Sequence, residues 1–241
     1  MKILHLDIET APHQAFVWGL FQQNVGINQL AKPGYTLCWS AKWHDKKGVL
    51  SAWHTDKHNL AALHQMMEEA DAICTYNGQK FDIPTLNREF LLHGLTPPAP
   101  AKQIDLYQTV KSRFRFASNK LDFVCQQLGL GSKVVHRGFD LWRDCMDEKA
   151  PARKEMLTYN KQDVVLLESL YNKLLPWIRN HPVASHDGGC VACGSHSLQK
   201  RGTIALAAGV YQRFQCQDCG RWSRDAVNLL SRPTTHIKRG L

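Results

Sequence analysis

The chain has 241 residues, with 30 Lys and Arg against 21 Asp and Glu, and a formal net charge of +9 when His is neutral. This length suits one substantial core with a small appended domain, and the positive charge favours polyanionic partners without establishing one. The N-terminal stretch is too charged for a secretory signal and no apolar run approaches the roughly 20 residues of a membrane span, so we expect a cytoplasmic protein without membrane contact.

Two acidic residues interrupt an apolar stretch near the N-terminus, LHLDIETAP at residues 4–12. Because side chains alternate between the faces of a strand, a strand here places Asp7 and Glu9 on one face and the leucines and isoleucine on the other. Two carboxylates at this spacing repel each other unless a cation lies between them or one stays protonated. The stretch therefore indicates a bound cation or a retained proton.

The segments that follow predict an α/β fold. Residues 35–53 contain two aromatic, β-rich runs joined by Asp45-Lys46-Lys47-Gly48, which is a hairpin signal. Periodicity and turn residues predict helices at 59–69, 83–93, 120–130 and 151–179, a strand at 72–77 and a loop at 96–101. Three strands followed by alternating helices and strands are similar to the ribonuclease H-like fold, a mixed sheet flanked by helices.

Two further acidic segments lie in these elements. In YNGQKFDIP, Asp82 stands before a predicted helix with Pro84 at its second position, so it can cap that helix or belong to a catalytic site. In LTYNKQDVVLLESLY, Tyr159 and Asp163 share one helix face, which alone also fits a Tyr at the core edge beside a solvated Asp. We interpret Asp105, in AKQIDLY, as a structural or supporting residue rather than a metal ligand.

In this order, Asp-x-Glu, Asn-Gly-x-x-Phe-Asp and Tyr-x-x-x-Asp resemble the three motifs of the DEDDy exonucleases. These DnaQ-like 3′–5′ exonucleases include proofreading domains of family B polymerases and stand-alone bacterial and phage nucleases. The resemblance covers about residues 1–175 and implies a bacterial or phage enzyme with two Mg²⁺ or Mn²⁺ ions, whose preferred ligands are oxygens. It implies that Asp7 contacts both ions, and that Glu9 and Asp163 complete the tighter site. Asp82 holds the second ion and Tyr159 orients the attacking water.

The segment VKSRFRFASNK at residues 110–120 is the candidate for substrate contact. Its basic side chains could follow a phosphate backbone while an aromatic ring stacks on a base, although a strand with Phe inside and Arg outside fits the same pattern. The residues concerned are Lys111, Arg113, Arg115 and Lys120, with Phe114 and Phe116 between them.

Two Cys-x-x-Cys-Gly knuckles near the C-terminus, separated by 22 residues, predict a zinc site formed by Cys190, Cys193, Cys216 and Cys219. Two disulfides or a thioredoxin-like redox pair are the alternatives, and both fit a reducing compartment poorly. A module this small has little core, so we expect one structural Zn²⁺ with all four positions filled by protein.

The cysteine segment resembles the zinc ribbons of insertion-sequence transposases and similar DNA-handling proteins. The resemblance implies a nucleic-acid surface, while a ribbon that binds a protein partner is the alternative. The implied contact residues are Lys200, Arg201, Tyr211, Arg213, Arg221, Trp222 and Arg224.

Together these observations predict an exonuclease domain at residues 1–179, a linker at 180–189 and a ribbon with a basic tail at 190–241. The expected activity is metal-dependent 3′–5′ hydrolysis of nucleic acid to nucleoside 5′-monophosphates, with single-stranded DNA favoured over RNA. The alternatives are an RNA exonuclease, a structure-specific endonuclease on the same fold, and a non-catalytic protein that binds nucleic acid through the ribbon.

Overall fold

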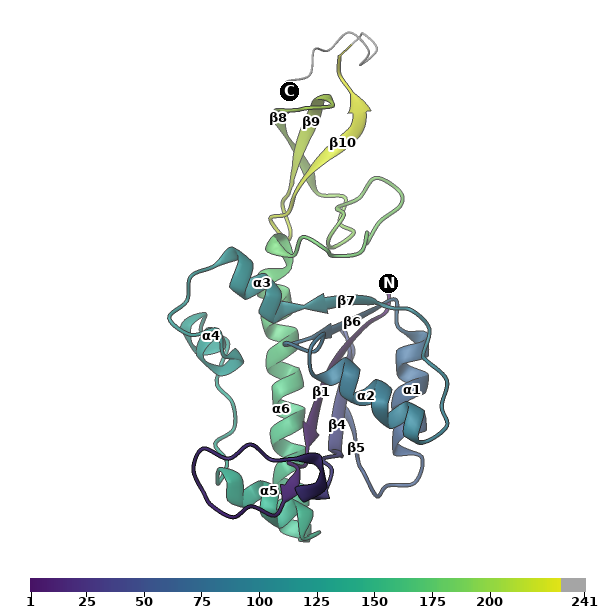
Figure 1. Cartoon of the computed structure of the whole chain (residues 1–241). Helices are drawn as coiled ribbons and strands as arrows, with labels where there is room; N and C mark the ends of the chain where they lie inside the picture. Colours follow the sequence, from purple (N-terminus) through teal and green to yellow (C-terminus); the bar gives the residue numbers. More distant parts are fainter. Residues whose placement is uncertain (231–241) are drawn as a thin grey trace. The chain divides into compact units, whose positions relative to one another are not determined.

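The computed structural model describes residues 1–230 and forms two compact units, Met1–Tyr171 and Asn172–Leu241 (Figure 1). Residues 231–241, part of the predicted basic tail, lie outside the described residues. The predicted domain bounds and the linker at 180–189 stay predictions. Among residues 1–230, no helix has the length and apolar character needed to cross a bilayer.

A five-stranded mixed sheet forms the centre of the first unit, in the order β5-β4-β1-β6-β7. β1 pairs antiparallel with β4, which pairs antiparallel with β5, while β6 runs parallel to both β1 and β7. The turn between β4 and β5 holds Asp45 and Gly48 at positive φ, as expected for these residue types, and confirms the predicted hairpin. The strands are β1 (Ile3–Thr10), β4 (Thr36–Trp43), β5 (Leu50–Trp53), β6 (Ala72–Thr75) and β7 (Lys102–Asp105).

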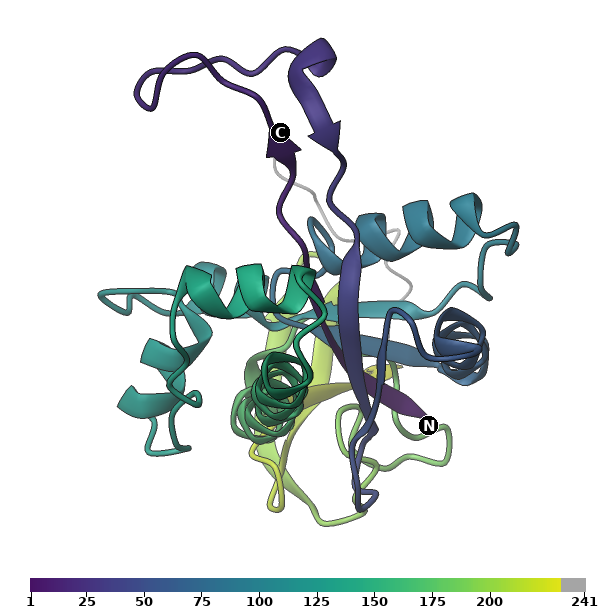
Figure 2. The ribbon, with the colours of Figure 1, turned by 90° about the horizontal axis from the view of Figure 1, so that it is seen from below.

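Helices cover both faces of this sheet (Figures 1 and 2). One face packs its buried leucines and isoleucines against α1 (Asn59–Glu69) and α2 (Asp82–Leu92). The other face packs against α5 (Phe139–Met146) and the long α6 (Ala150–Leu174). This mixed α/β architecture confirms the predicted fold class. Two shorter helices, α3 (Leu106–Arg113) and α4 (Leu121–Gln127), follow β7.

Asp105 ends β7 and caps α3. Its Oδ1 accepts hydrogen bonds from the backbone N–H groups of Tyr107 and Asn77, at 3.0 and 2.9 Å. One carboxylate therefore joins the start of a helix to the turn after β6, which is the structural role predicted for Asp105.

A narrow two-stranded projection extends from the end of β1 (Figure 2). Its strands, β2 (Gln14–Ala15) and β3 (Leu30–Lys32), pair antiparallel, and a short 3-10 helix, η1 (Ile27–Gln29), precedes β3. Nothing in the sequence pattern predicted this two-stranded projection.

The second unit contains a three-stranded antiparallel sheet in the order β10-β9-β8. A short 3-10 helix, η2 (Leu175–Trp177), precedes the sheet. The strands are β8 (Leu198–Leu206), β9 (Gly209–Cys216) and β10 (Trp222–Asn228).

Candidate active site and cysteine cluster

Three carboxylates from two elements converge on the sheet face that is covered by α6. Asp7 and Glu9 point to this face because they alternate along β1 with Leu4, Leu6 and Ile8, which belong to the core under α1 and α2. Asp163 comes from α6, and its side chain is only 2% exposed. The carboxylate oxygens of Asp7, Glu9 and Asp163 lie within 4.8 Å of one another.

Asp82 approaches the same strand from the start of α2. β6 pairs with β1 only from Ile3 to His5, so the N–H of Ile8 has no partner on β6. Asp82 Oδ1 accepts that N–H at 3.2 Å, and the N-cap position of α2 is occupied by Phe81. Asp82 is therefore the first residue of α2 rather than its N-cap. Asp82 lies outside the group of three carboxylates, yet its charge raises the pKa of Asp7.

The acids are held in an environment that disfavours their charged forms. Burial, followed by the charge of Asp82, raises the pKa of Asp7 well above its usual range. Burial, followed by the charge of Asp163, raises the pKa of Glu9 to about 8. Burial raises the pKa of Asp82 to about 7, against hydrogen bonds from backbone N–H groups. A cation among these carboxylates would relieve the repulsion that the sequence indicated.

Lys133 is a member of this cluster that sequence reasoning missed. It lies in the irregular segment between α4 and α5, and its Nζ donates to Asp163 Oδ2 at 2.5 Å and to the Tyr159 hydroxyl at 2.9 Å. Burial and the Asp163 charge raise the pKa of Tyr159 to about 12, although the hydrogen bond from Lys133 opposes this shift. Tyr159 is therefore a neutral phenol near pH 7, suited to hydrogen bonding rather than to proton abstraction.

Asn160 is the second missed residue. Its Nδ2 donates to Asp7 Oδ2 at 2.7 Å, and the residue is completely buried on α6. An amide that holds one carboxylate oxygen fixes the orientation of the other. The only sequence signal for Asn160 is its position directly after Tyr159.

A groove of about 770 Å³ opens over the cluster. Asp7, Tyr159, Lys133 and His136 contribute to its lining. Of the four basic residues predicted at 111–120, only Lys120 lines the groove, whereas Lys111, Arg113 and Arg115 lie elsewhere on α3 and the following loop. Phe114 and Phe116 follow α3 in this loop rather than on a strand, and their rings contact each other, with centroids 5.7 Å apart.

The carboxylates fit a divalent cation. Asp163 Oδ1 is buried and has no hydrogen-bond partner, so one oxygen of the cluster is unsatisfied. The carboxylate donors are all oxygens, which suit Mg²⁺ or Mn²⁺ better than softer metals. Asp7, Glu9 and Asp163 form the group that could hold such an ion, and Asp82 is placed to contribute beside them.

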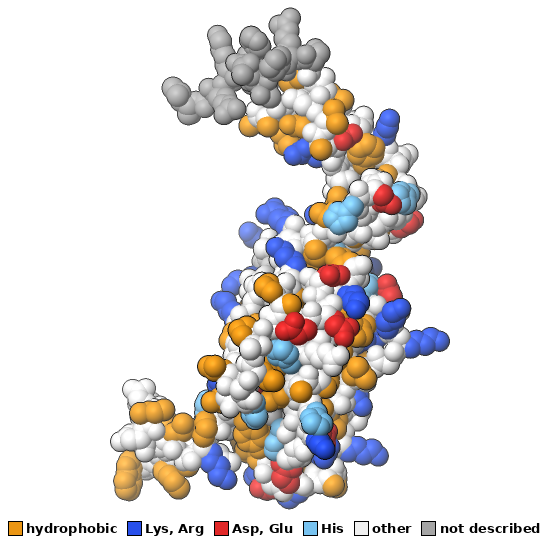
Figure 3. Space-filling view, turned by 90° about the vertical axis from the view of Figure 1, so that its right-hand side faces the viewer, with side chains coloured by type: hydrophobic (Ala, Val, Ile, Leu, Met, Phe, Trp, Pro, Cys, Tyr) orange, Lys and Arg blue, Asp and Glu red, His pale blue; other side chains and the backbone are white. Residues whose placement is uncertain are grey.

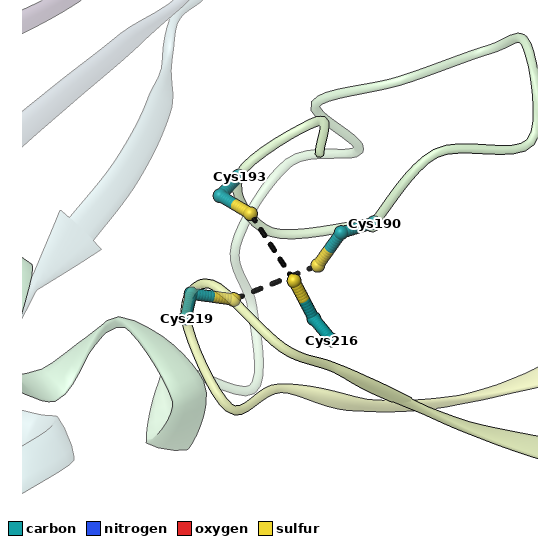
Figure 4. Close-up of side chains that lie close together, drawn as sticks. All are labelled: Cys190, Cys193, Cys216 and Cys219. Carbon is teal, nitrogen blue, oxygen red and sulfur yellow. Dashed lines mark hydrogen bonds between the residues drawn. The ribbon is translucent and has the colours of Figure 1, made fainter. Parts of the chain in front are cut away.

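The second unit brings together all four predicted cysteines (Figure 4). The sulfur atoms of Cys190 and Cys219 are 3.6 Å apart, and those of Cys193 and Cys216 are also 3.6 Å apart. A disulfide needs about 2.05 Å between sulfurs, whereas a tetrahedral site with bonds of about 2.3 Å has edges of about 3.8 Å. The cluster therefore fits one Zn²⁺ and not two disulfides.

The basic residues predicted on the ribbon have different surroundings. Lys200 and Arg201 are exposed, and the Arg213 guanidinium lies over the ring of Trp222 at 4.8 Å from its centroid. Arg221 donates to the carbonyl oxygens of Pro176 and Ile178, at 2.9 and 2.8 Å. Arg224 lies over the ring of the buried Tyr211 at 4.2 Å from its centroid.

Comparison with known proteins identifies the class to which this fold belongs. A model of the RNase_H superfamily matches residues 4–175, so the chain belongs to that superfamily. The family B DNA polymerase from the hyperthermophilic archaeon Pyrobaculum calidifontis has a similar structure, with a TM-score of 0.53 and 20% sequence identity. The match covers 73% of this chain and 24% of the polymerase chain, and at this identity it shows the fold alone. A search of curated proteins gave no match.

Proposed function

We propose that the chain is a metal-dependent 3′–5′ exonuclease that releases nucleoside 5′-monophosphates, with single-stranded DNA as its preferred substrate. The observation that carries the proposal is the convergence of Asp7, Glu9 and Asp163 on one sheet face, with oxygens within 4.8 Å of one another. Membership of the RNase H superfamily supports a nuclease. The exonucleolytic mode and its direction rest on the resemblance to the DEDDy motifs.

The proposal gives each residue of the cluster a role. Asp7, Glu9, Asp163 and Asp82 would hold two Mg²⁺ or Mn²⁺ ions, which supply the charge that activates water and stabilises the leaving 3′ oxygen. Tyr159 donates or accepts a hydrogen bond at the groove wall and orients the attacking water. Asn160 fixes the carboxylate of Asp7, and Lys133 holds Asp163 and Tyr159 in position.

The ribbon is proposed to bind one structural Zn²⁺ and to assist nucleic-acid binding. Four sulfurs fill all the positions of a tetrahedral site, so no position stays open for catalysis. The exposed Lys200 and Arg201 support a contact with phosphates. Arg221 is bound to backbone carbonyls and fits a structural role better than a phosphate contact.

Digestion of 5′-labelled single-stranded DNA and RNA with Mg²⁺, Mn²⁺ or EDTA tests the proposal. We expect stepwise shortening from the 3′ end that EDTA and Asp7→Asn abolish, and the better substrate identifies the class of nucleic acid. Asp140→Asn is the matched control, because Asp140 is an exposed carboxylate on α5 paired with Arg143. Internal cleavage would indicate an endonuclease instead of an exonuclease. Binding without cleavage under every condition would refute catalysis.

A further inference from the structure

The two-stranded projection that follows β1 exposes an unusual amount of apolar surface. We define the apolar lobe as residues 14–32. Trp18 is 98% exposed, Leu20 is 88% exposed and Phe21 is 86% exposed. Phe16 and Ile27 are also largely exposed, and orange side chains gather on the projection at the lower left of Figure 3. Contiguous apolar surface of this kind usually marks a binding site.

Backbone hydrogen bonds hold the apolar lobe in place, rather than a core of its own. The Phe16 N–H donates to the Gln29 carbonyl at 3.0 Å, and the Gln29 side chain donates to the Phe16 carbonyl at 3.0 Å. The Gly26 N–H donates to Gln29 Oε1 at 2.8 Å. Gln29 thus closes the base of the lobe, while the apolar side chains beyond it stay outside.

The apolar lobe carries no formal charge from residue 14 to residue 31, in a chain with a net charge of +9. Phosphate contacts need Lys, Arg or N–H donors, so these exposed rings are not suited to follow a nucleic-acid backbone. Aromatic and aliphatic side chains are suited to the faces of bases, which stack on Trp and Phe without sequence preference.

A second hollow, beside the residues that precede the apolar lobe, shares His136 with the carboxylate groove. Thr10 and Pro12, between Glu9 and the lobe, line a hollow of about 400 Å³ together with His136, Phe139 and Trp142. His136 also lines the groove beside Asp7 and Tyr159. Gln14, the first residue of the lobe, contacts Met146 Sδ on α5 at 3.5 Å. The exposed ring of Phe139 adds apolar surface at this hollow.

We propose that the apolar lobe binds unpaired bases of the nucleic acid whose end enters the carboxylate groove. This inference rests on the proposed function and adds a substrate requirement to it. Stacking on Trp18 and Phe21 holds the bases upstream of the terminal nucleotide, while cations of the groove such as Lys120 hold the phosphates. The hollow that shares His136 with the groove favours bases over a protein partner, because a strand cut in the groove would lie next to this hollow.

Binding of a fluorescent single-stranded DNA 20-mer, followed by anisotropy with Ca²⁺ in place of Mg²⁺, tests the inference. We compare the full chain with the double variant Trp18→Ser and Phe21→Ser, and we expect binding at least about tenfold weaker in the variant. Both residues are exposed, so the variant keeps its core. The matched control is Leu91→Ser with Leu92→Ser, which removes exposed apolar side chains from the end of α2.

An oligonucleotide with abasic sites near its 3′ end separates base contacts from phosphate contacts. We expect the wild-type chain and the lobe variant to bind this strand equally. An equal loss on normal and abasic strands, or wild-type affinity in the variant, would overturn the inference. A wild-type dimer that the variant abolishes in sedimentation, without a change in DNA binding, would also overturn it and assign the lobe to a second copy of the chain.

Hydrolysis of the p-nitrophenyl ester of thymidine 5′-monophosphate distinguishes failure of the lobe from failure of the proposed function. This substrate has one nucleotide and does not reach the apolar lobe, so we expect the lobe variant to hydrolyse it at the wild-type rate. If the wild-type chain hydrolyses neither the ester nor the oligonucleotide, the proposed function fails. The binding comparison then still decides whether the lobe contacts bases.

Discussion

Replacement of Lys133 by Met tests the ion pair at the carboxylate cluster. The Asp163 side chain is 2% exposed and Lys133 is 28% exposed, so the change leaves a nearly buried carboxylate without its cation. Removing one partner of a fully buried pair lowers the free energy of unfolding by about 3–5 kcal/mol. Because Lys133 is partly exposed, we expect a loss of about 2–3 kcal/mol. For a unit of this size that corresponds to a fall in Tm of about 4–12 °C.

Thermal melts of the metal-free protein at pH 8, with and without millimolar Mn²⁺, measure this effect. We expect Mn²⁺ to recover most of the lost Tm, because a cation bound by Asp163 replaces the ammonium group. Lys120→Met is the control, since it removes an exposed lysine from the same groove. A fall no larger than that of the control, or one that Mn²⁺ leaves unchanged, would refute the reasoning.

Three further predictions concern the acids, their amide partner and the cysteine cluster. Burial raises the pKa of Glu9 to about 8 and that of Asp82 to about 7, so the folded state binds more protons than the unfolded state. The free energy of unfolding in EDTA, measured by denaturant titration, therefore falls as pH rises from about 4.5 to 8. We expect Mg²⁺ to flatten this slope. A free energy of unfolding that rises with pH would contradict the raised pKa values of the two acids. Asn160→Ala frees the Asp7 carboxylate and lowers kcat about tenfold or more with an unchanged circular dichroism spectrum, and full activity would exclude the positioning role. Cys193→Ser removes bound zinc, as measured by elemental analysis. In NMR spectra the amide resonances of the zinc ribbon lose their dispersion, while those of residues 1–171 stay unchanged. Retained zinc would argue against a four-cysteine site.

The strand and helix patterns of the sequence predicted the placement of most residues of the candidate site. The alternation along β1 placed Asp7 and Glu9 on one face, and the spacing of Tyr159 and Asp163 placed both on one side of α6. These inferences depend on local periodicity, which can be counted directly in the sequence. The cysteine spacing likewise predicted the cluster, because each Cys-x-x-Cys knuckle is a local structure.

Features set by tertiary contacts were not predictable in the same way. Lys133 reaches Asp163 from an irregular segment, where no period indicates a direction. Asp82 has the sequence context of a helix cap, but its carboxylate binds an N–H that β6 leaves free on a different element. The FVWGLF run of the apolar lobe has the composition of a core segment, and only the fold shows that its side chains are exposed.

The position of β1 has a consequence for how the protein fluctuates. β1 pairs with β4 along nearly its whole length and with β6 at its start, and Asp82 holds the Ile8 N–H where β6 ends. Strands of this kind exchange their amide hydrogens only when the whole domain opens, whereas a two-residue ladder such as that of β2 and β3 opens locally. Asp7 and Glu9 therefore keep their spacing while the apolar lobe a few residues later opens locally. One continuous chain segment thus combines a rigid end that carries the carboxylates with an adaptable end.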